Sequence, residues 1–410
     1  MRASNAASAS RVESGRAQWL PVAAVLMGTG WGSNQISPLL LVYSRALGMS
    51  TGMLEAMFGV YALGLIPGLL LAGPFSDLRG RRKVVIPAAV LSFVATLALI
   101  AGGHNEGLLF LGRFLAGVSS GAVFGAGSAW VRELSRPPYG TSSEHTAARR
   151  TAVSMTAGFG LGPLASGLLA QWAPFPTVVP YLPHLILMAG ILVAVRTAPE
   201  TVSSDKRRAF RLDVPGLRNP RFLRSVVPMA PWIFAATSIA FALLPRVVGA
   251  ESVSGGIAIV ASMTTLCLLC GVLIQPLARR IDARRGANAT AIVGLVILGV
   301  GMLVCAVAAE VGSIWLLIPC AIVLGSAYGM CIVAGLVEVQ RLADPEALAK
   351  LIAVFYALTY AGFAAPYLMA LAAHLASYPV ILSVTAALAL ATAVIIREPR
   401  GGHKSRVPSA

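Results

Sequence analysis

Long apolar stretches alternate with short hydrophilic connections along almost the whole chain. Twelve stretches lie at 18–43, 53–75, 84–103, 107–131, 150–171, 176–196, 224–245, 252–277, 287–308, 312–337, 348–372 and 376–396. A helix that crosses the hydrocarbon core of a bilayer needs about 20 mostly apolar residues. The pattern therefore predicts an all-α polytopic membrane protein with about twelve transmembrane helices.

The basic residues support this topology. Connections after even-numbered stretches and both termini are basic, whereas connections after odd-numbered stretches carry almost no Lys or Arg. Of the 32 basic residues, only Arg45 and Arg246 fall on the second side, and Arg113 lies inside a stretch. The positive-inside rule then predicts a multi-pass protein of the cell membrane, inner or plasma, with both termini in the cytoplasm.

Composition excludes several other classes of protein. Hydrophobic residues make up 57% of the 410 and charged residues only 12%, which leaves almost nothing for a separate soluble domain. The net charge of +16 follows from the membrane topology, so it does not indicate binding to nucleic acid. All five cysteines lie in apolar stretches without His or acidic neighbours and are interpreted as packing residues. No metal or cofactor is expected.

The chain divides into two similar halves. We predict an N-terminal six-helix bundle at 1–197, a cytoplasmic linker at 198–223 and a C-terminal six-helix bundle at 224–410. The linker is strongly basic, which predicts attraction to anionic membrane lipids. Arg45 and Arg246 follow the first stretch of each half, and Asp77 and Asp282 follow the second at nearly the same offset. Such repeats are common in secondary transporters, where two bundles rock about a central site.

The connection after the second stretch carries a motif. It reads Gly73-Pro-Phe-Ser-Asp77-Leu-Arg-Gly80-Arg81-Arg82-Lys83 and resembles the signature of cytoplasmic loop 2–3 in the major facilitator superfamily. The resemblance implies the major facilitator fold, with two pseudo-symmetric six-helix bundles. It also implies a conformational switch at Gly73, Asp77, Gly80, Arg81 and Arg82. In that family the Asp is held near the start of span 11, which here begins Asp344-Pro345-Glu346, a typical helix start.

Two further motifs resemble the drug/proton antiporter-like branch of this family. In span 4, Arg113 precedes Gly117 by four residues, and span 5 contains Gly158, Gly162 and Pro163. Arg113 either lines a cavity or extends to the headgroups, because a buried cation inside a span is costly. The span 5 residues either mark an exporter or serve only close helix packing. The resemblance favours export over import.

Polar and aromatic residues inside the spans indicate a substrate cavity. Trp31, Asn34 and Gln35 are three and four residues apart and would share one face of a helix. The predicted cavity residues are Trp31, Asn34, Gln35, Arg113, Trp232, Tyr328, Tyr356 and Tyr360. Such groups suit an amphipathic organic molecule.

Candidates for proton coupling are few. All sixteen Asp and Glu residues can be assigned to loops, tails or the ends of spans. Asp77, Glu55 and His184 remain as possible coupling groups, although a lone His in an apolar span can equally be structural. Proton coupling is thus implied by the resemblance rather than by the residues, and uniport stays open.

The predicted function is efflux of a drug-like compound or metabolite in exchange for protons or another gradient ion, by a monomer. Nutrient or sugar uptake, and a membrane sensor without transport, are the alternatives. An embedded enzyme is disfavoured, because the five His are scattered and no His-carboxylate pair lies in a span. The chain also lacks the phosphate-binding loop of a nucleotide-driven pump.

Overall fold

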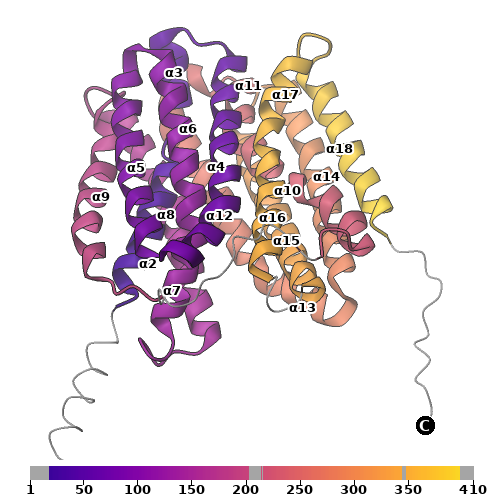
Figure 1. Ribbon diagram of the computed structural model, residues 1–410. Coiled ribbons are helices and arrows are strands. Elements are labelled where there is room, and N and C mark those ends of the chain that lie inside the picture. Colours follow the sequence, from indigo (N-terminus) through magenta and orange to yellow (C-terminus); the bar gives the residue numbers. More distant parts are fainter. Residues whose placement is uncertain (1–17, 203–213, 215, 344–347, 398–410) are drawn as a thin grey trace, which may run out of the picture.

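The computed structural model describes residues 18–202, 214, 216–343 and 348–397, and the regular secondary structure in these ranges is all helical. Figure 1 shows an N-terminal group of helices, indigo and magenta, beside a C-terminal group, orange and yellow. Eleven helices among the described residues are long and apolar enough to cross a membrane. The prediction of an all-α membrane protein with about twelve spans is confirmed.

The two halves contribute similar sets of helices. The first half contains α2 (Leu20–Asn34), α3 (Leu40–Leu47), α4 (Thr51–Arg79), α5 (Arg82–Ala101), α6 (Glu106–Ala122), α7 (Ser128–Ser135), α8 (Glu144–Trp172) and α9 (Leu182–Ala194). The second contains α10 (Val227–Ser238), α11 (Leu244–Val247), α12 (Gly256–Leu273), α13 (Gln275–Arg285), α14 (Ala287–Val311), α15 (Leu317–Leu342), α16 (Leu348–Tyr360), α17 (Ala365–Ala372) and α18 (Tyr378–Ile395).

The first predicted span is broken, which corrects the expectation of one helix over 18–43. The helix α2 ends at Asn34, and α3 begins only at Leu40. Pro38 has no N–H, so the α-helical hydrogen bond from residue 38 to the Asn34 carbonyl is missing. Shorter backbone bonds take over, from Ser37 N–H to the Asn34 carbonyl at 3.0 Å and from Leu39 N–H to the Ile36 carbonyl at 2.9 Å.

Glycines bring the helices of the first half into backbone contact. A Cβ atom at Gly117 of α6 would lie 2.1 Å from the carbonyl oxygen of Tyr61 in α4. A Cβ atom at Gly158 of α8 would lie 2.1 Å from the carbonyl oxygen of Met27 in α2. Small residues allow such approach in membrane helices, where packing rather than the hydrophobic effect holds helices together.

The second half repeats both crossings. At Gly325 of α15, an added Cβ would lie 2.1 Å from the carbonyl oxygen of Cys267 in α12. At Gly362, in a short 3₁₀ helix between α16 and α17, it would lie 2.1 Å from the carbonyl oxygen of Pro231 in α10. Each half also has its own buried core. The repeat is therefore visible in helix packing as well as in sequence.

The start of the predicted linker packs on the first half. The Trp130 indole N–H donates to the Pro199 carbonyl at 2.9 Å, and the Tyr139 hydroxyl donates to the Glu200 carbonyl at 3.1 Å. Residues 203–213 and 215 lie outside the described residues, so the domain boundaries stay a prediction.

We expect Gly117→Ala to destabilise the protein by about 1–3 kcal/mol, the usual cost of overpacking, because the new methyl group meets backbone that cannot turn away. Thermal unfolding of the purified protein in detergent measures this. Gly190→Ala in α9 is the matched control, since nothing lies within 4 Å of its added Cβ. Equal melting temperatures for the two variants would contradict the close crossing.

Candidate functional site: the cavity between the two halves

A small, nearly closed cavity of about 10 Å³ lies between the two halves. It is lined by Ser33, Asn34, Tyr61, Phe159, Phe234, Thr237, Phe241, Leu268, Tyr328, Tyr360 and Phe363. Seven of these eleven described residues are aromatic and none is charged, so the walls suit an apolar or aromatic ligand better than an ion. The described residues also contain no group of three His, Cys, Asp or Glu that could hold a metal.

Aromatic rings from both halves meet around this cavity. Phe234 stacks on Tyr360 with ring centroids 4.4 Å apart, and on Phe363 at 5.0 Å. Phe363 also contacts Tyr61 of the first half edge-on at 6.0 Å, and Phe58 contacts Phe241 across the same interface at 6.0 Å. Such pairs favour offset or edge contacts and add to the area they bury.

An ion pair joins the halves at the end opposite the basic loops. Glu55 lies in the first turns of α4, and Arg246 lies in α11 of the other half. The two side chains are in contact and only 0% and 5% exposed. Removing one partner of such a buried pair leaves the other charge buried without compensation, which lowers stability by about 3–5 kcal/mol. The pair therefore holds this end of the bundle closed.

Arg113 is fully buried and stabilises the break in the first span. Its Nη1 donates to the Ser33 carbonyl at 3.1 Å and its Nε to the Met57 carbonyl at 3.4 Å. Its guanidinium also lies over the Tyr61 ring at 4.4 Å and the Phe58 ring at 5.4 Å. The headgroup interpretation is wrong, because only 1% of the residue is exposed. Arg113 lies behind the cavity wall rather than in it.

Gln35 and His184 belong to a buried polar network instead of the cavity. The Gln35 amide donates to the Thr96 hydroxyl at 3.3 Å, and this hydroxyl bonds His184 Nδ1 at 2.9 Å. His184 Nε2 lies 3.1 Å from the Gly28 carbonyl oxygen. This geometry matches the structural interpretation of His184, and it corrects the prediction that Gln35 lines the cavity. Gln35 is still helical, with its N–H bonded to the Trp31 carbonyl at 3.0 Å, so its side chain points about 100° away from that of Asn34.

Three predicted aromatic residues also lie elsewhere. Trp31 packs its backbone on Gly162 of α8, and the Trp232 indole N–H donates to the Thr392 hydroxyl in α18 at 3.1 Å. Tyr356 contacts the neighbouring Phe355 ring and is not among the lining residues.

Asn34, Tyr328 and Tyr360 do line the cavity, as predicted. Sequence reasoning missed the phenylalanines, because an apolar ring in an apolar span carries no distinguishing signal.

The loop motif forms a charge cluster within the first half. Arg81 pairs with Asp77 at 2.6 Å and with Glu133, at the end of α7, at 2.8 Å. Burial alone lowers the pKa of Arg81, but the hydrogen bonds and charges of Glu133 and Asp77 raise it above its usual value. Arg81 is therefore a permanent cation that ties the α4–α5 loop to α7.

Contacts with Glu200 explain why the motif has a glycine at position 80. Its carboxylate accepts the backbone N–H groups of Arg81 and Arg82, each at 2.9 Å. Gly80 has φ of +103°, and a Cβ there would lie 2.5 Å from the Glu200 carboxylate. By contrast, nothing lies within 4 Å of a Cβ at Gly73, so no neighbouring helix requires a glycine there in this conformation. The predicted partner of Asp77, at 344–346, lies outside the described residues.

The second half carries the equivalent connection. The Asp282 carboxylate binds Arg341 of α15 through two hydrogen bonds of 3.0 and 2.9 Å. In both halves, an Asp after the second span is thus linked to the end of the fourth span. The connection that holds Asp282 keeps this contact, although it lacks the glycine that opens the motif of the first half.

Comparison with known proteins identifies the family. The family model of the Major Facilitator Superfamily matches residues 22–250, which is more than half of the chain. The chain belongs to the major facilitator superfamily. It is therefore a multi-pass membrane transporter of small molecules, and the resemblance seen in its motifs is confirmed.

Similar proteins are known by sequence and by structure. Efflux pump radE of Floropilus chiversii is 30% identical over 41% of this chain and 33% of its own length. Multidrug resistance protein MdtL of Klebsiella pneumoniae is 36% identical over 22% of this chain and 23% of its own length. The chain thus matches a third or less of the length of these two relatives.

Solved transporters of the superfamily share the fold. A point mutant of the nucleoside transporter NupG superposes with a TM-score of 0.73 at 14% identity, over 92% of this chain and 98% of its own. The peptide transporter POT superposes with a TM-score of 0.75 at 13% identity, over 92% and 93%.

We expect Arg113→Met to lower the free energy of unfolding by about 2–5 kcal/mol. The change leaves the Ser33 carbonyl unpaired, at a cost of about 1–3 kcal/mol for a buried unsatisfied group, and it also removes the contact of the guanidinium with the Tyr61 ring, worth up to about 2 kcal/mol. Arg113→Lys should recover part of this loss, because one ammonium can reach one carbonyl but not both. Thermal unfolding in detergent measures the series, with the exposed Arg279→Met as control. A melting temperature for Arg113→Met equal to that of the control would contradict the assigned role.

Proposed function

We propose that this superfamily member exports a drug-like compound or metabolite by alternating access, in exchange for protons. The aromatic, uncharged cavity between the halves is the observation that carries this proposal. Lipophilic molecules gain most from such walls, and aromatic faces also attract organic cations. The names of the relatives radE and MdtL, an efflux pump and a multidrug resistance protein, point the same way.

Sugar or nutrient uptake fits the cavity less well. Sugars need several directed hydrogen bonds, whereas Asn34 supplies the single amide among the described lining residues; the other polar groups are the hydroxyls of Ser33, Thr237 and three tyrosines, which are mostly aromatic surface. A uniporter and a sensor without transport remain outcomes of the test below. One chain provides both walls of the cavity, which supports a functional monomer.

We assign the conformation to the state that opens toward the cytoplasm. The basic end is cytoplasmic by the positive-inside rule. At the other end, the Glu55–Arg246 pair and the Phe58–Phe241 contact close the interface. At the basic end, the open space beside Gly73 supports a separation of α4 from its neighbours. Export requires the bundles to rock until the closed end opens.

Glu55 is our candidate for proton coupling. Asp77 lies at the membrane surface in its pair with Arg81, and both nitrogens of His184 are engaged in the buried network. Glu55 differs, because its charge joins two bodies that must separate in each cycle. A proton on Glu55 removes the attraction to Arg246, so external acid favours the state that opens outward.

Proteoliposome transport tests the function and the coupling group together. We expect a lipophilic cationic dye to move faster when a pH gradient is imposed. Glu55→Gln should keep downhill movement but lose most of this acceleration, because Gln cannot exchange a proton. A sugar panel under the same gradient tests the uptake alternative.

A second variant separates a loss of proton coupling from a folding defect. Glu55→Gln leaves Arg246 buried without its partner, so Glu55→Gln/Arg246→Gln removes both charges and is measured beside it. Gradient acceleration that persists in a folded double variant would exclude Glu55 as the coupling group. Dye binding without flux in the wild-type protein would favour the sensor, and flux without a gradient response would favour the uniporter.

Asp77→Asn should slow transport more than it harms folding. Its side chain is 39% exposed, so the lost pair with Arg81 costs less than about 1 kcal/mol. We expect near-normal expression and melting temperature with a clearly reduced dye flux. Normal flux at normal expression would remove Asp77 from the mechanism.

A further inference from the structure

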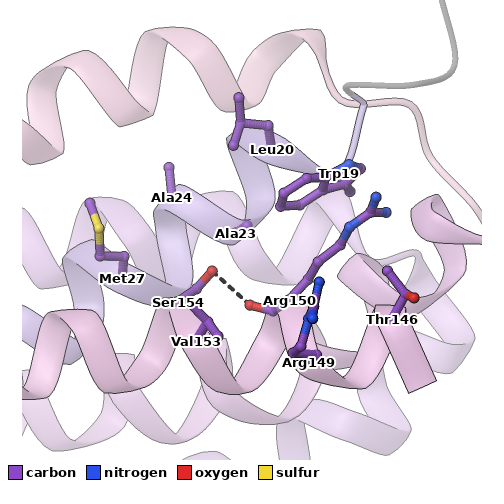
Figure 2. Close-up of a pocket in the computed structure, with 10 residues that line it drawn as sticks. All are labelled: Trp19, Leu20, Ala23, Ala24, Met27, Thr146, Arg149, Arg150, Val153 and Ser154. Atoms are coloured by element: carbon purple, nitrogen blue, oxygen red, sulfur yellow. Dashed lines mark hydrogen bonds between the residues drawn. The ribbon is translucent and has the colours of Figure 1, made fainter. Parts of the chain in front are cut away.

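A groove between α2 and α8 at the basic end has two chemically distinct parts. It is lined by Trp19, Leu20, Ala23, Ala24, Met27, Thr146, Arg149, Arg150, Val153 and Ser154. Figure 2 shows Arg150 reaching from α8 toward Trp19 at the start of α2, with Arg149 and Thr146 beside it. The Arg150 guanidinium lies 4.1 Å from the centre of the Trp19 ring. Cations thus collect at one end of an otherwise apolar groove.

The two parts lie at different depths in the membrane. The helix α8 has 29 residues and is therefore about 44 Å long, close to the thickness of a bilayer with its headgroups. Arg149 and Arg150 lie about 8–9 Å from its first residue, at the level of the headgroups. Ala24, Met27 and Val153 lie deeper, where acyl chains begin.

The groove faces away from the transport cavity. In α8, Phe159 lines that cavity, whereas at 100° per residue Arg150 lies on the opposite side of the helix and Val153 lies about 120° from Phe159. Leu20 and Val153 are 55% and 60% exposed, as expected for side chains that contact lipid. On α2, the side of Gly28 is covered by Met188 of α9.

We infer that this groove binds one membrane phospholipid with an anionic headgroup. The headgroup phosphate lies against Arg149 and Arg150, Trp19 orients the guanidinium of Arg150, and an acyl chain follows Ala24 and Met27. Charge complementarity at headgroup depth and apolar walls below it favour a lipid over a soluble anion. The site is separate from the transport cavity and does not depend on the identity of the substrate.

Lipid binding by the purified full chain tests this site. Native mass spectrometry and thermal unfolding are measured with phosphatidylglycerol and with phosphatidylcholine. We expect phosphatidylglycerol to bind more tightly and to raise the melting temperature further. Arg149→Gln/Arg150→Gln should weaken phosphatidylglycerol binding about 25-fold, since each basic residue at an anionic surface contributes about fivefold.

Two controls separate the site from general surface charge. Arg279→Gln/Arg280→Gln removes the same charge from an exposed arginine pair of α13 at the same end of the bundle, and it should keep the preference for phosphatidylglycerol. Ala24→Phe keeps every charge but fills the apolar part, and it should also weaken binding. Equal loss in both arginine pairs would overturn the proposal. So would unchanged binding in Ala24→Phe, or full displacement of the lipid by soluble glycerol phosphate.

Discussion

Backbone contact at glycine crossings is the constraint on which this structure depends. Between membrane helices there is little hydrophobic driving force, so stability requires the surfaces to approach closely. Gly117 and Gly158 bring helices of the first half together, and Gly325 and Gly362 do the same at the equivalent crossings of the second. Each half thus becomes a firm body. The contacts between the halves include aromatic side chains, one ion pair and the packing of α8 on α12, where the Thr265 hydroxyl donates to the Gly160 carbonyl at 3.2 Å.

The polar groups of the first half mostly maintain its shape. The break after Asn34 frees backbone carbonyls inside the membrane, where each unsatisfied group is expensive. Arg113 donates a hydrogen bond to the Ser33 carbonyl, and the Ser166 hydroxyl donates to the Gln35 carbonyl at 2.6 Å. The Gln35 side-chain amide donates to the Thr96 hydroxyl. A charged residue within a span therefore need not mark a binding site, because a broken helix can need it just as much.

Sequence patterns predicted the spans, the two halves and the loop motif, because hydropathy and charge are set by the membrane itself. They predicted the cavity less well, since a lining residue must lie in a span and also face inward. Tyr328 and Tyr360 satisfied both conditions, whereas Trp31 is not among the lining residues and Trp232 donates to Thr392 of α18. Asn34 and Gln35 were placed on one face, but neighbouring residues of a helix point about 100° apart, and Gln35 turns to Thr96. The contact of Glu55 with Arg246 could not be derived from two span ends far apart in the chain.

The distribution of charge contacts suits a molecule that opens at one end. At the basic end, Arg81 with Asp77 and Arg341 with Asp282 each act within one half. These contacts persist when the bundles separate, so they oppose no rocking motion. Opening the other end instead requires separation of Glu55 from Arg246, a buried pair whose stability depends on both charges. In the cycle proposed above, a proton on Glu55 removes this attraction, and external acid therefore favours opening of that end.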